Sequence, residues 1–165
     1  MSSAVVFDSR TGNTELLAKW LAEEVCDCIY CGNIENSVDA QIYYVGFWTD
    51  KGDCTDKVKN FLEKLHGKKI YLFGTAGFGA DEEYFKRILN RVKGYIPEDN
   101  TVEGTFMCQG KMPKSVRDRY EKMLTEPEKA AQAEMFIKNF DMAASHPDNK
   151  DRENLINQFK IHCNS

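Results

Sequence analysis

Short apolar runs recur along the first two thirds of the chain, separated by segments that carry apolar residues at helical spacing. An apolar run without polar alternation is typical of a strand covered on both faces. Strands are therefore expected at 4–7, 28–30, 42–47, 70–73 and 105–108. Because helical patterns lie between these runs, the alternation predicts a parallel sheet with crossover helices. The pattern thus indicates the α/β fold class.

The last third of the chain changes to a helix-only pattern. Thr125 to Glu128 has the Thr-x-x-Glu form of a capping box and predicts a helix start there. Asp148 and Asp151 are placed to cap a last helix. We predict a single domain over 1–165, in which residues 114–165 form a helical C-terminal extension packed on the sheet.

Composition narrows the function classes. The chain has 165 residues, 42% of them hydrophobic, which suits one domain with one sizeable core. Its formal net charge is −4 and no basic run is present, so nucleic acid is not expected as a partner. No apolar stretch is long enough to cross a bilayer and no basic leader precedes the first strand. We therefore expect a cytoplasmic protein with no membrane partner.

The cysteines do not form a recognisable metal motif. Three of them cluster within six residues, and no second close pair completes a tetrahedral site. Strand alternation would place Cys28 and Cys31 on opposite faces. We predict reduced thiols, with a redox-active or metal-bound cluster as the alternative. The cysteines are Cys26, Cys28, Cys31, Cys54, Cys108 and Cys163.

The loop Ser9–Thr14 directly follows the first expected strand and precedes the first expected helix. Parallel sheets bind ligands outside the carboxyl ends of their strands, so this loop is a candidate site. Three hydroxyls and the amides of a helix N-terminus make a neutral anion cradle, which Gly12 lets the backbone close. No Gly-Lys-Ser/Thr follows, and the three-glycine dinucleotide fingerprint is missing. We predict a phosphate site, with a Ser/Thr-rich helix cap as the alternative.

The same loop carries a family resemblance. Residues 5–15 resemble the FMN-phosphate signature of flavodoxins, a Ser/Thr-x-Thr-Gly-x-Thr loop after the first strand. The similarity extends in order through at least residue 110. Within it, 46–53 and 74–79 stand at the positions of the loops that cover the two flavin faces. The resemblance implies a flavodoxin-like three-layer sandwich, a five-stranded parallel sheet in order 2-1-3-4-5, FMN as cofactor and electron transfer as activity. The long helical tail is similar to a flavodoxin-domain variant of anaerobic bacteria and archaea.

The resemblance also implies a set of cofactor-binding residues. Trp48 is expected to stack on the flavin, and Phe78 stands where the other loop often has Tyr. Each has a plain structural alternative as a hydrophobic plug. Gly52 resembles the glycine whose peptide reorients on one-electron reduction, although Lys51 precedes it in place of an aromatic. The implied set is Ser9, Arg10, Thr11, Gly12, Asn13, Thr14, Phe47, Trp48, Thr49, Asp50, Lys51, Gly52, Thr75, Ala76, Gly77, Phe78 and Gly79.

Two functions compete on these residues. An electron carrier that passes electrons between redox protein partners is favoured, because no nicotinamide-binding fingerprint is present. The alternative is an FMN-dependent reductase of a small molecule, and a module that kept the fold without flavin is a third hypothesis. No Ser, Cys and His arrangement suggests a triad, so no catalytic residue is assigned. Asp50 and Asp53 should make flavin reduction harder, and Lys51 should make it easier.

Overall fold

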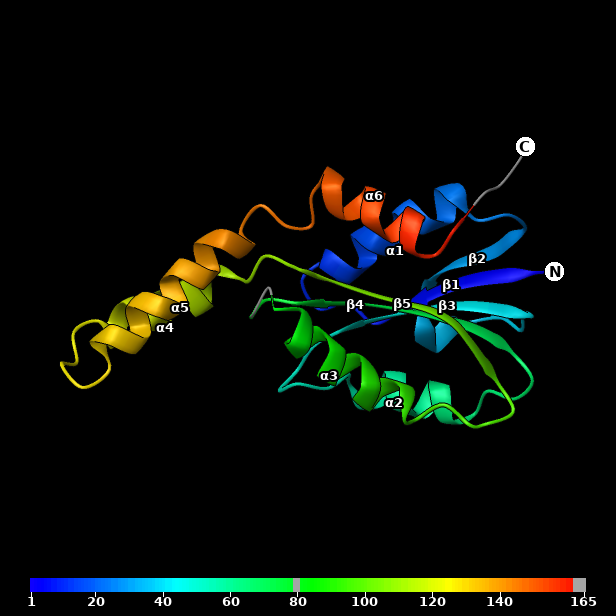
Figure 1. Ribbon diagram of the computed structural model, residues 1–165, viewed down its shortest axis with the longest axis horizontal. Helices are drawn as coiled ribbons and strands as arrows, with labels where there is room; N and C mark the ends of the chain where they lie inside the picture. The colour runs from blue at the N-terminus through cyan, green and yellow to red at the C-terminus, as the bar shows by residue number, and fades with distance from the viewer. Residues whose placement is uncertain (79–80, 162–165) are drawn as a thin grey trace.

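A computed structural model describes residues 1–78 and 81–161 of the chain. Its strands form one parallel sheet in the order β2-β1-β3-β4-β5 (Figure 1). The predicted fold class and strand order are therefore confirmed. The strands are β1 (Ser3–Phe7), β2 (Cys28–Asn33), β3 (Ile42–Trp48), β4 (Lys69–Ala76) and β5 (Thr101–Gln109).

Helices cover both faces of the sheet and complete three layers. On one face α1 (Asn13–Glu24) and α6 (Asn149–Gln158) bury Leu17, Leu21 and Leu155 against the strands. On the other face α2 (Asp56–Glu63) and α3 (Glu82–Lys93) bury Val58, Leu62, Ile88 and Val92. A short 3-10 helix, η1 (Ile34–Asn36), follows β2. The central strands β1, β3 and β4 are mostly apolar because both of their faces are covered.

A helical hairpin stands apart from these layers. It consists of α4 (Lys114–Met123) and α5 (Ala130–Ala143) and extends away from the carboxyl end of the sheet (Figure 1). The rings of Tyr120 and Phe136 lie 5.1 Å apart within it, and Arg117 pairs with both Glu121 and Asp141. The described part of the C-terminal extension, residues 114–161, therefore contains this hairpin and α6, which lies on the sheet beside α1. Every helix in the described ranges is too short or too polar to span a bilayer.

The two capping predictions have different outcomes. The prediction for α6 is confirmed, since Asp148 Oδ1 accepts from Asp151 N and Asp151 Oδ2 accepts from Asp148 N, both at 2.9 Å. The helix start predicted from Thr125 to Glu128 is wrong. Thr125 Oγ1 donates to Lys122 O at 2.7 Å and so belongs to the turn after α4. The next helix, α5, begins at Ala130.

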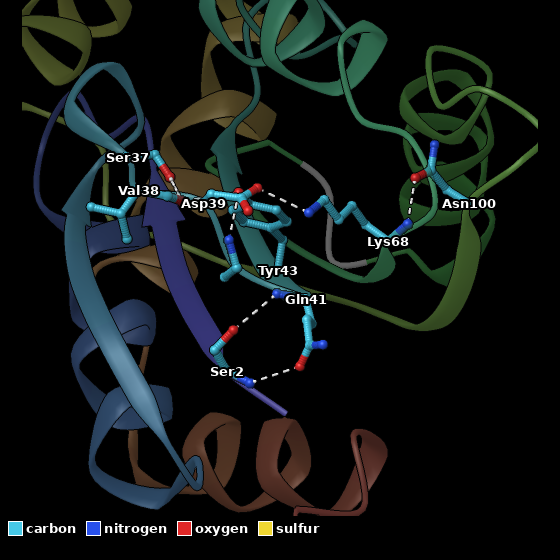
Figure 2. Close-up of polar contacts among 9 residues, drawn as sticks. Ser2, Ser37, Val38, Asp39, Gln41, Tyr43, Lys68 and Asn100 are labelled. Atoms are coloured by element: carbon cyan, nitrogen blue, oxygen red, sulfur yellow. Dashed lines mark hydrogen bonds and ion pairs between the residues drawn. The ribbon is translucent and has the colours of Figure 1, made fainter.

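The loops at the amino end of the sheet are tied to one another. Ser2 N donates to Gln41 Oε1 and Gln41 N donates to Ser2 Oγ, both at 3.2 Å (Figure 2). The Lys68 ammonium lies 2.9 Å from Asp39, and Lys68 N donates to Asn100 Oδ1 at 2.9 Å. Several polar groups at this end are thus paired with one another. Parallel sheets bind ligands at the carboxyl ends of their strands, so the ligand site is expected at the opposite end.

The cysteines require one correction. Cys26 is disulfide-bonded, whereas Cys28, Cys31, Cys54 and Cys108 are free thiols. The prediction of reduced thiols is therefore wrong for Cys26, because spacing in sequence does not report which sulfur atoms meet in the fold. Burial raises the pKa of Cys54 to about 12, so this thiol is inert at neutral pH. Cys163, also predicted to be reduced, lies outside the described residues.

Candidate cofactor site

A cavity of about 650 Å³ opens at the carboxyl end of the sheet. Its volume lies within the range of small-molecule sites. The segments after β1, β3 and β4 contribute three walls, and the start of α4 contributes a fourth. The lining residues are Ser9, Arg10, Thr11, Asn13, Thr14, Trp48, Thr49, Asp50, Lys51, Gly52, Thr75, Ala76, Gly77, Phe78, Tyr84, Lys111, Met112, Pro113, Ser115, Val116 and Arg119.

The loop between β1 and α1 presents hydrogen-bond donors to this cavity. Gly12 is the N-cap of α1 and holds φ +94°, a left-handed value that suits glycine. Ser9 Oγ accepts from Gly12 N at 3.2 Å and from Glu15 N at 3.3 Å, which shapes the loop. Within residues 1–78 and 81–161, no acceptor pairs with the amides of Thr11, Asn13 and Thr14. These free donors at a helix N-terminus suit an anion.

The two threonine hydroxyls of the loop have different hydrogen-bond partners. Thr11 Oγ1 accepts from Asn13 Nδ2 at 3.3 Å, so the hydroxyl proton of this threonine stays available to a ligand. The Thr14 side chain is fully buried, with its Oγ1 3.2 Å from Phe47 O and 3.0 Å from Thr75 Oγ1. Since a hydroxyl has one proton, Thr14 mainly joins the floor of the site to β3 and β4.

The segment after β3 forms a tight turn beside the cavity. Asp50 and Asp53 exchange two backbone hydrogen bonds, of 2.8 and 3.1 Å, around Lys51 at φ +53° and Gly52 at φ +80°. Two positive φ values in succession define a type I′ turn. Gly52 O accepts from Arg91 Nη1 at 3.4 Å. The turn is thus preset, and the Gly52 carbonyl is held by an arginine of α3.

An aromatic ring stands before this turn. The Arg10 guanidinium lies 5.5 Å from the centre of the Trp48 ring, so a cation from the β1 loop covers that ring. Thr49 donates to Thr75 O through both its amide, at 3.0 Å, and its hydroxyl, at 2.8 Å. Trp48 is therefore placed at the cavity by a segment fastened to β4.

The segment after β4 is fastened to the hairpin. Gly77 O accepts from Gln109 Nε2 at 3.3 Å and from Asn139 Nδ2 at 3.0 Å. Phe78 is 46% exposed and meets the Phe136 ring edge-on, with ring centres 5.3 Å apart. A Cβ at residue 77 would collide with the Met112 side chain. The hairpin therefore sets the position of this wall.

The start of α4 is the wall that sequence reasoning missed. Asn13 Nδ2 donates to Lys111 O at 2.8 Å, and Lys111 N donates to His146 O at 2.9 Å, which draws the segment across the sheet to α1. No motif marks these residues, and the scattered cations between Lys111 and Arg119 do not form a basic run. The missed lining residues are Tyr84, Lys111, Met112, Pro113, Ser115, Val116 and Arg119.

The lining is cationic in an acidic chain. Among the described residues that line the cavity, four are cationic and one is acidic. The cations are Arg10, Lys51, Lys111 and Arg119, and the acid is Asp50. Asp53, which was expected to influence the flavin, accepts from Tyr95 OH at 2.5 Å and is not among the lining residues. This hydrogen bond raises the pKa of Tyr95 to about 12. The local charge therefore favours an anionic ligand.

The structure brings together nearly all of the implied cofactor residues. The exceptions are Gly12, Phe47 and Gly79. Gly12 lines a smaller hollow behind the loop, and the Phe47 side chain is fully buried in the core. Gly79 lies outside the described residues. That the remaining residues bind a cofactor stays a prediction.

Comparison with known proteins agrees with this geometry. A family model described as Flavodoxin domain matches residues 4–160. The flavodoxin-like domain-containing protein BilS of Clostridium symbiosum (strain WAL-14163) is 37% identical over 172 residues, covering 92% of this chain and 90% of that protein. BilS of Clostridioides difficile (strain CD3) is 33% identical over 158 residues, with the same coverage of both chains.

Two solved structures share the fold at low identity. A flavodoxin from the domain Archaea has a TM-score of 0.52 at 13% identity, covering 87% of this chain and 99% of its own. A flavoprotein in complex with FMN from Lactobacillus acidophilus NCFM also has a TM-score of 0.52, at 11% identity, covering 73% of this chain and 98% of its own.

Proposed function

The chain belongs to the flavodoxin domain family, and we propose that it binds FMN non-covalently at the carboxyl end of its sheet and carries electrons between redox proteins. One observation carries the proposal. Unpaired amides in the loop between β1 and α1 open into a cavity that also holds the Trp48 side chain. Family membership supports FMN as the cofactor, in agreement with the expectation from sequence.

The donors present fit the phosphate of FMN. The amides of Thr11, Asn13 and Thr14, together with the Thr11 hydroxyl, would hold the phosphate oxygens, and the N-terminus of α1 adds its dipole. The Arg10 guanidinium would supply a full positive charge. Riboflavin lacks the phosphate, so it could not use these groups.

Side chains of two other loops fit the ring system. Trp48 and Phe78 would lie beside the isoalloxazine and exclude water from it. FMN, when bound, supplies the redox chemistry, while the protein supplies binding, orientation and electrostatics. Lys51, Lys111 and Arg119 favour negative charge at the cavity, which should make reduction of the cofactor easier.

A second candidate function is an FMN-dependent reductase of a small molecule. It is favoured because Met112 and Val116 of the fourth wall, together with Tyr84 of α3, extend the cavity beyond the loops that resemble those of flavodoxins. The carrier is preferred since the chain lacks a nicotinamide-binding fingerprint and so has no evident hydride source of its own.

One experiment separates the two functions. The protein is loaded with FMN, and its consumption of NADH or NADPH is compared with the rate at which the photoreduced protein reduces a cytochrome c. A carrier shows negligible nicotinamide oxidation and rapid transfer to the cytochrome. Sustained nicotinamide oxidation coupled to turnover of a small acceptor would favour the reductase, and failure to retain FMN would contradict both.

A further inference from the structure

We propose that the cavity-side surface of the α4–α5 hairpin is a docking face for a redox protein whose own contact surface is apolar at its centre and acidic around it. The inference rests on the proposed carrier function and adds the kind of partner. The docking face consists of Phe78, Lys111, Arg119, Lys122, Met135 and Met142.

The basic half of this face is one stripe of α4. Ser115, Arg119 and Lys122 follow one another at i, i+4 and i+7, a spacing that places them on the same side of a helix. Ser115 and Arg119 line the cavity, so the stripe borders the cavity mouth. Of the acids of α4, Asp118 precedes Lys122 by four residues and flanks the stripe, but neither Asp118 nor Glu121 is among the described residues that line the cavity. The side of α4 that borders the cavity is therefore cationic.

The apolar half is a stripe of α5. Met135, Asn139 and Met142 are also spaced i, i+4 and i+7. Asn139 Nδ2 donates to Gly77 O, whose residue lines the cavity, so this stripe runs beside the cavity as well. Met135 is 72% exposed and Met142 is 54% exposed. Both methionines therefore leave more than half of their surface uncovered beside the asparagine that fastens α5 to the cavity wall.

These two stripes fit a protein partner. Methionine adapts its shape and is common at binding surfaces, and Phe78 adds an exposed aromatic ring. A cationic border suits carboxylates on the partner and speeds their encounter. The acidic residues Asp81 to Glu83 lie at the start of α3, outside the hairpin, where they stabilise the N-terminus of that helix. A partner with an acidic border would therefore be oriented toward the hairpin, beside the cofactor.

The first test uses two cytochromes c of opposite charge, an acidic bacterial protein and the basic mitochondrial one. FMN-loaded, photoreduced protein is mixed with each by stopped flow at rising NaCl. We expect the rate constant for the acidic cytochrome to fall about tenfold between about 20 and about 300 mM salt. The rate constant for the basic cytochrome should not fall. A fall for the basic cytochrome alone would overturn the proposal.

The second test uses matched variants that spare the cavity lining. Met135→Glu combined with Met142→Glu should lower the rate constant for the acidic cytochrome at least about fivefold. Ile29→Glu with Val38→Glu is the control, since both residues are exposed and lie near β2 and the amino end of the sheet. In the same way, Lys122→Glu is the test variant in α4 and Lys69→Glu, at the start of β4, is its control. Equal effects of test and control variants would overturn the docking face.

The outcomes separate the docking face from the function. A protein that holds FMN and reduces both cytochromes without salt dependence keeps the carrier function and loses the docking face. A protein that does not retain FMN loses the function itself. Sedimentation of the wild type and of the methionine variant tests whether a second copy of this chain occupies the docking face instead. Dimerisation of the wild type that the variant abolishes would assign the face to a second copy of this chain and contradict the proposal.

Discussion

The two ends of the sheet differ in where their loop polar groups find partners. At the amino end, Asn100 accepts from Lys68 N and donates to both Leu65 O and Pro97 O, so one side chain closes the neighbouring turns. At the carboxyl end, the amides of Thr11 and Asn13 find no acceptor in the described part of the chain. The loops at the amino end thus use their hydrogen-bonding groups within the protein, whereas loops at the carboxyl end leave donors available to a ligand.

The ligand-facing loops are nevertheless held in place. Thr14 fixes the floor and Asn139 fixes the wall after β4. Such preorganisation lowers the ordering cost of binding. The carboxyl end therefore combines unpaired donors with fixed backbone, which the amino end does not need.

The largest expected effect concerns the free donors. Thr11→Val removes a hydroxyl whose proton is unused within the protein, so stability should hardly change. FMN should bind more weakly by about 1.5–3 kcal/mol, since a hydrogen bond to a charged group is lost. Riboflavin affinity should stay the same. The measurement is a flavin-fluorescence titration of both ligands, and an equal loss for the two flavins would argue against a phosphate role for Thr11.

Next in size is a pair of polar links, one at each end, of which Thr14 is buried and Asn100 is partly buried. Thr14→Val removes the hydroxyl that contacts Phe47 O and Thr75 Oγ1, and Asn100→Ala leaves Lys68 N without its side-chain acceptor. Each should lower the free energy of unfolding by about 1–3 kcal/mol. Urea melts measure that loss. Only Thr14→Val should also weaken the binding of both FMN and riboflavin. Weaker flavin binding by Asn100→Ala would contradict the distinction between the two ends.

The glycines with positive φ provide a third contrast. Gly52 at φ +80° lies in the turn beside the cavity, and Gly67 at φ +67° lies in a turn at the amino end. Alanine at either position should cost about 1–2 kcal/mol of backbone strain. Only Gly52→Ala should change the separation between the two reduction potentials of bound FMN, because only that turn borders the cofactor. Anaerobic potentiometry checks this, and an unchanged separation would show that Gly52 is an ordinary turn residue.

Arg91 sharpens the same point. Its guanidinium holds Gly52 O at 3.4 Å, a long and exposed contact. Arg91→Ala should therefore change the separation between the two reduction potentials less than Gly52→Ala does. Its effect on the free energy of unfolding should be small. A shift larger than that of the glycine variant would mean that the arginine, not the backbone freedom of residue 52, controls this turn.

The smallest expected effect distinguishes the tryptophans. Trp48 lines the cavity, whereas Trp20 lies on α1. Trp48→Phe should remove most of the quenching of tryptophan fluorescence by FMN and cost about 0.5–1.5 kcal/mol of flavin affinity. Trp20→Phe should do neither. If Trp48→Phe leaves both quantities unchanged, Trp48 is a plug of the sheet end rather than a cover of the cofactor.

The sequence predicted those parts of the site that depend on neighbours in the chain. The cradle from Ser9 to Thr14 follows a strand and opens a helix, so its donors could be located from local pattern alone. The apolar runs predicted the sheet for the same reason, because burial on both faces leaves a mark in each strand.

The missed parts depend on contacts between distant residues. Asn139 reaches Gly77 across 62 positions, and Asn13 reaches Lys111 across 98. Neither partner carries a motif, so the fourth wall and its cations could not be located. Local pattern also misled at Thr125, where the hydroxyl bonds backward to α4 because the turn, rather than a new helix, uses it.

The central claim is that the loop between β1 and α1 binds the phosphate of FMN, and the ratio of FMN to riboflavin affinity tests it most directly. Apoprotein is titrated with each flavin, and quenching of flavin fluorescence gives the two dissociation constants. Two charge-assisted hydrogen bonds of about 1.5–3 kcal/mol each predict that FMN binds at least about 100-fold more tightly. Equal dissociation constants for FMN and riboflavin would contradict the account.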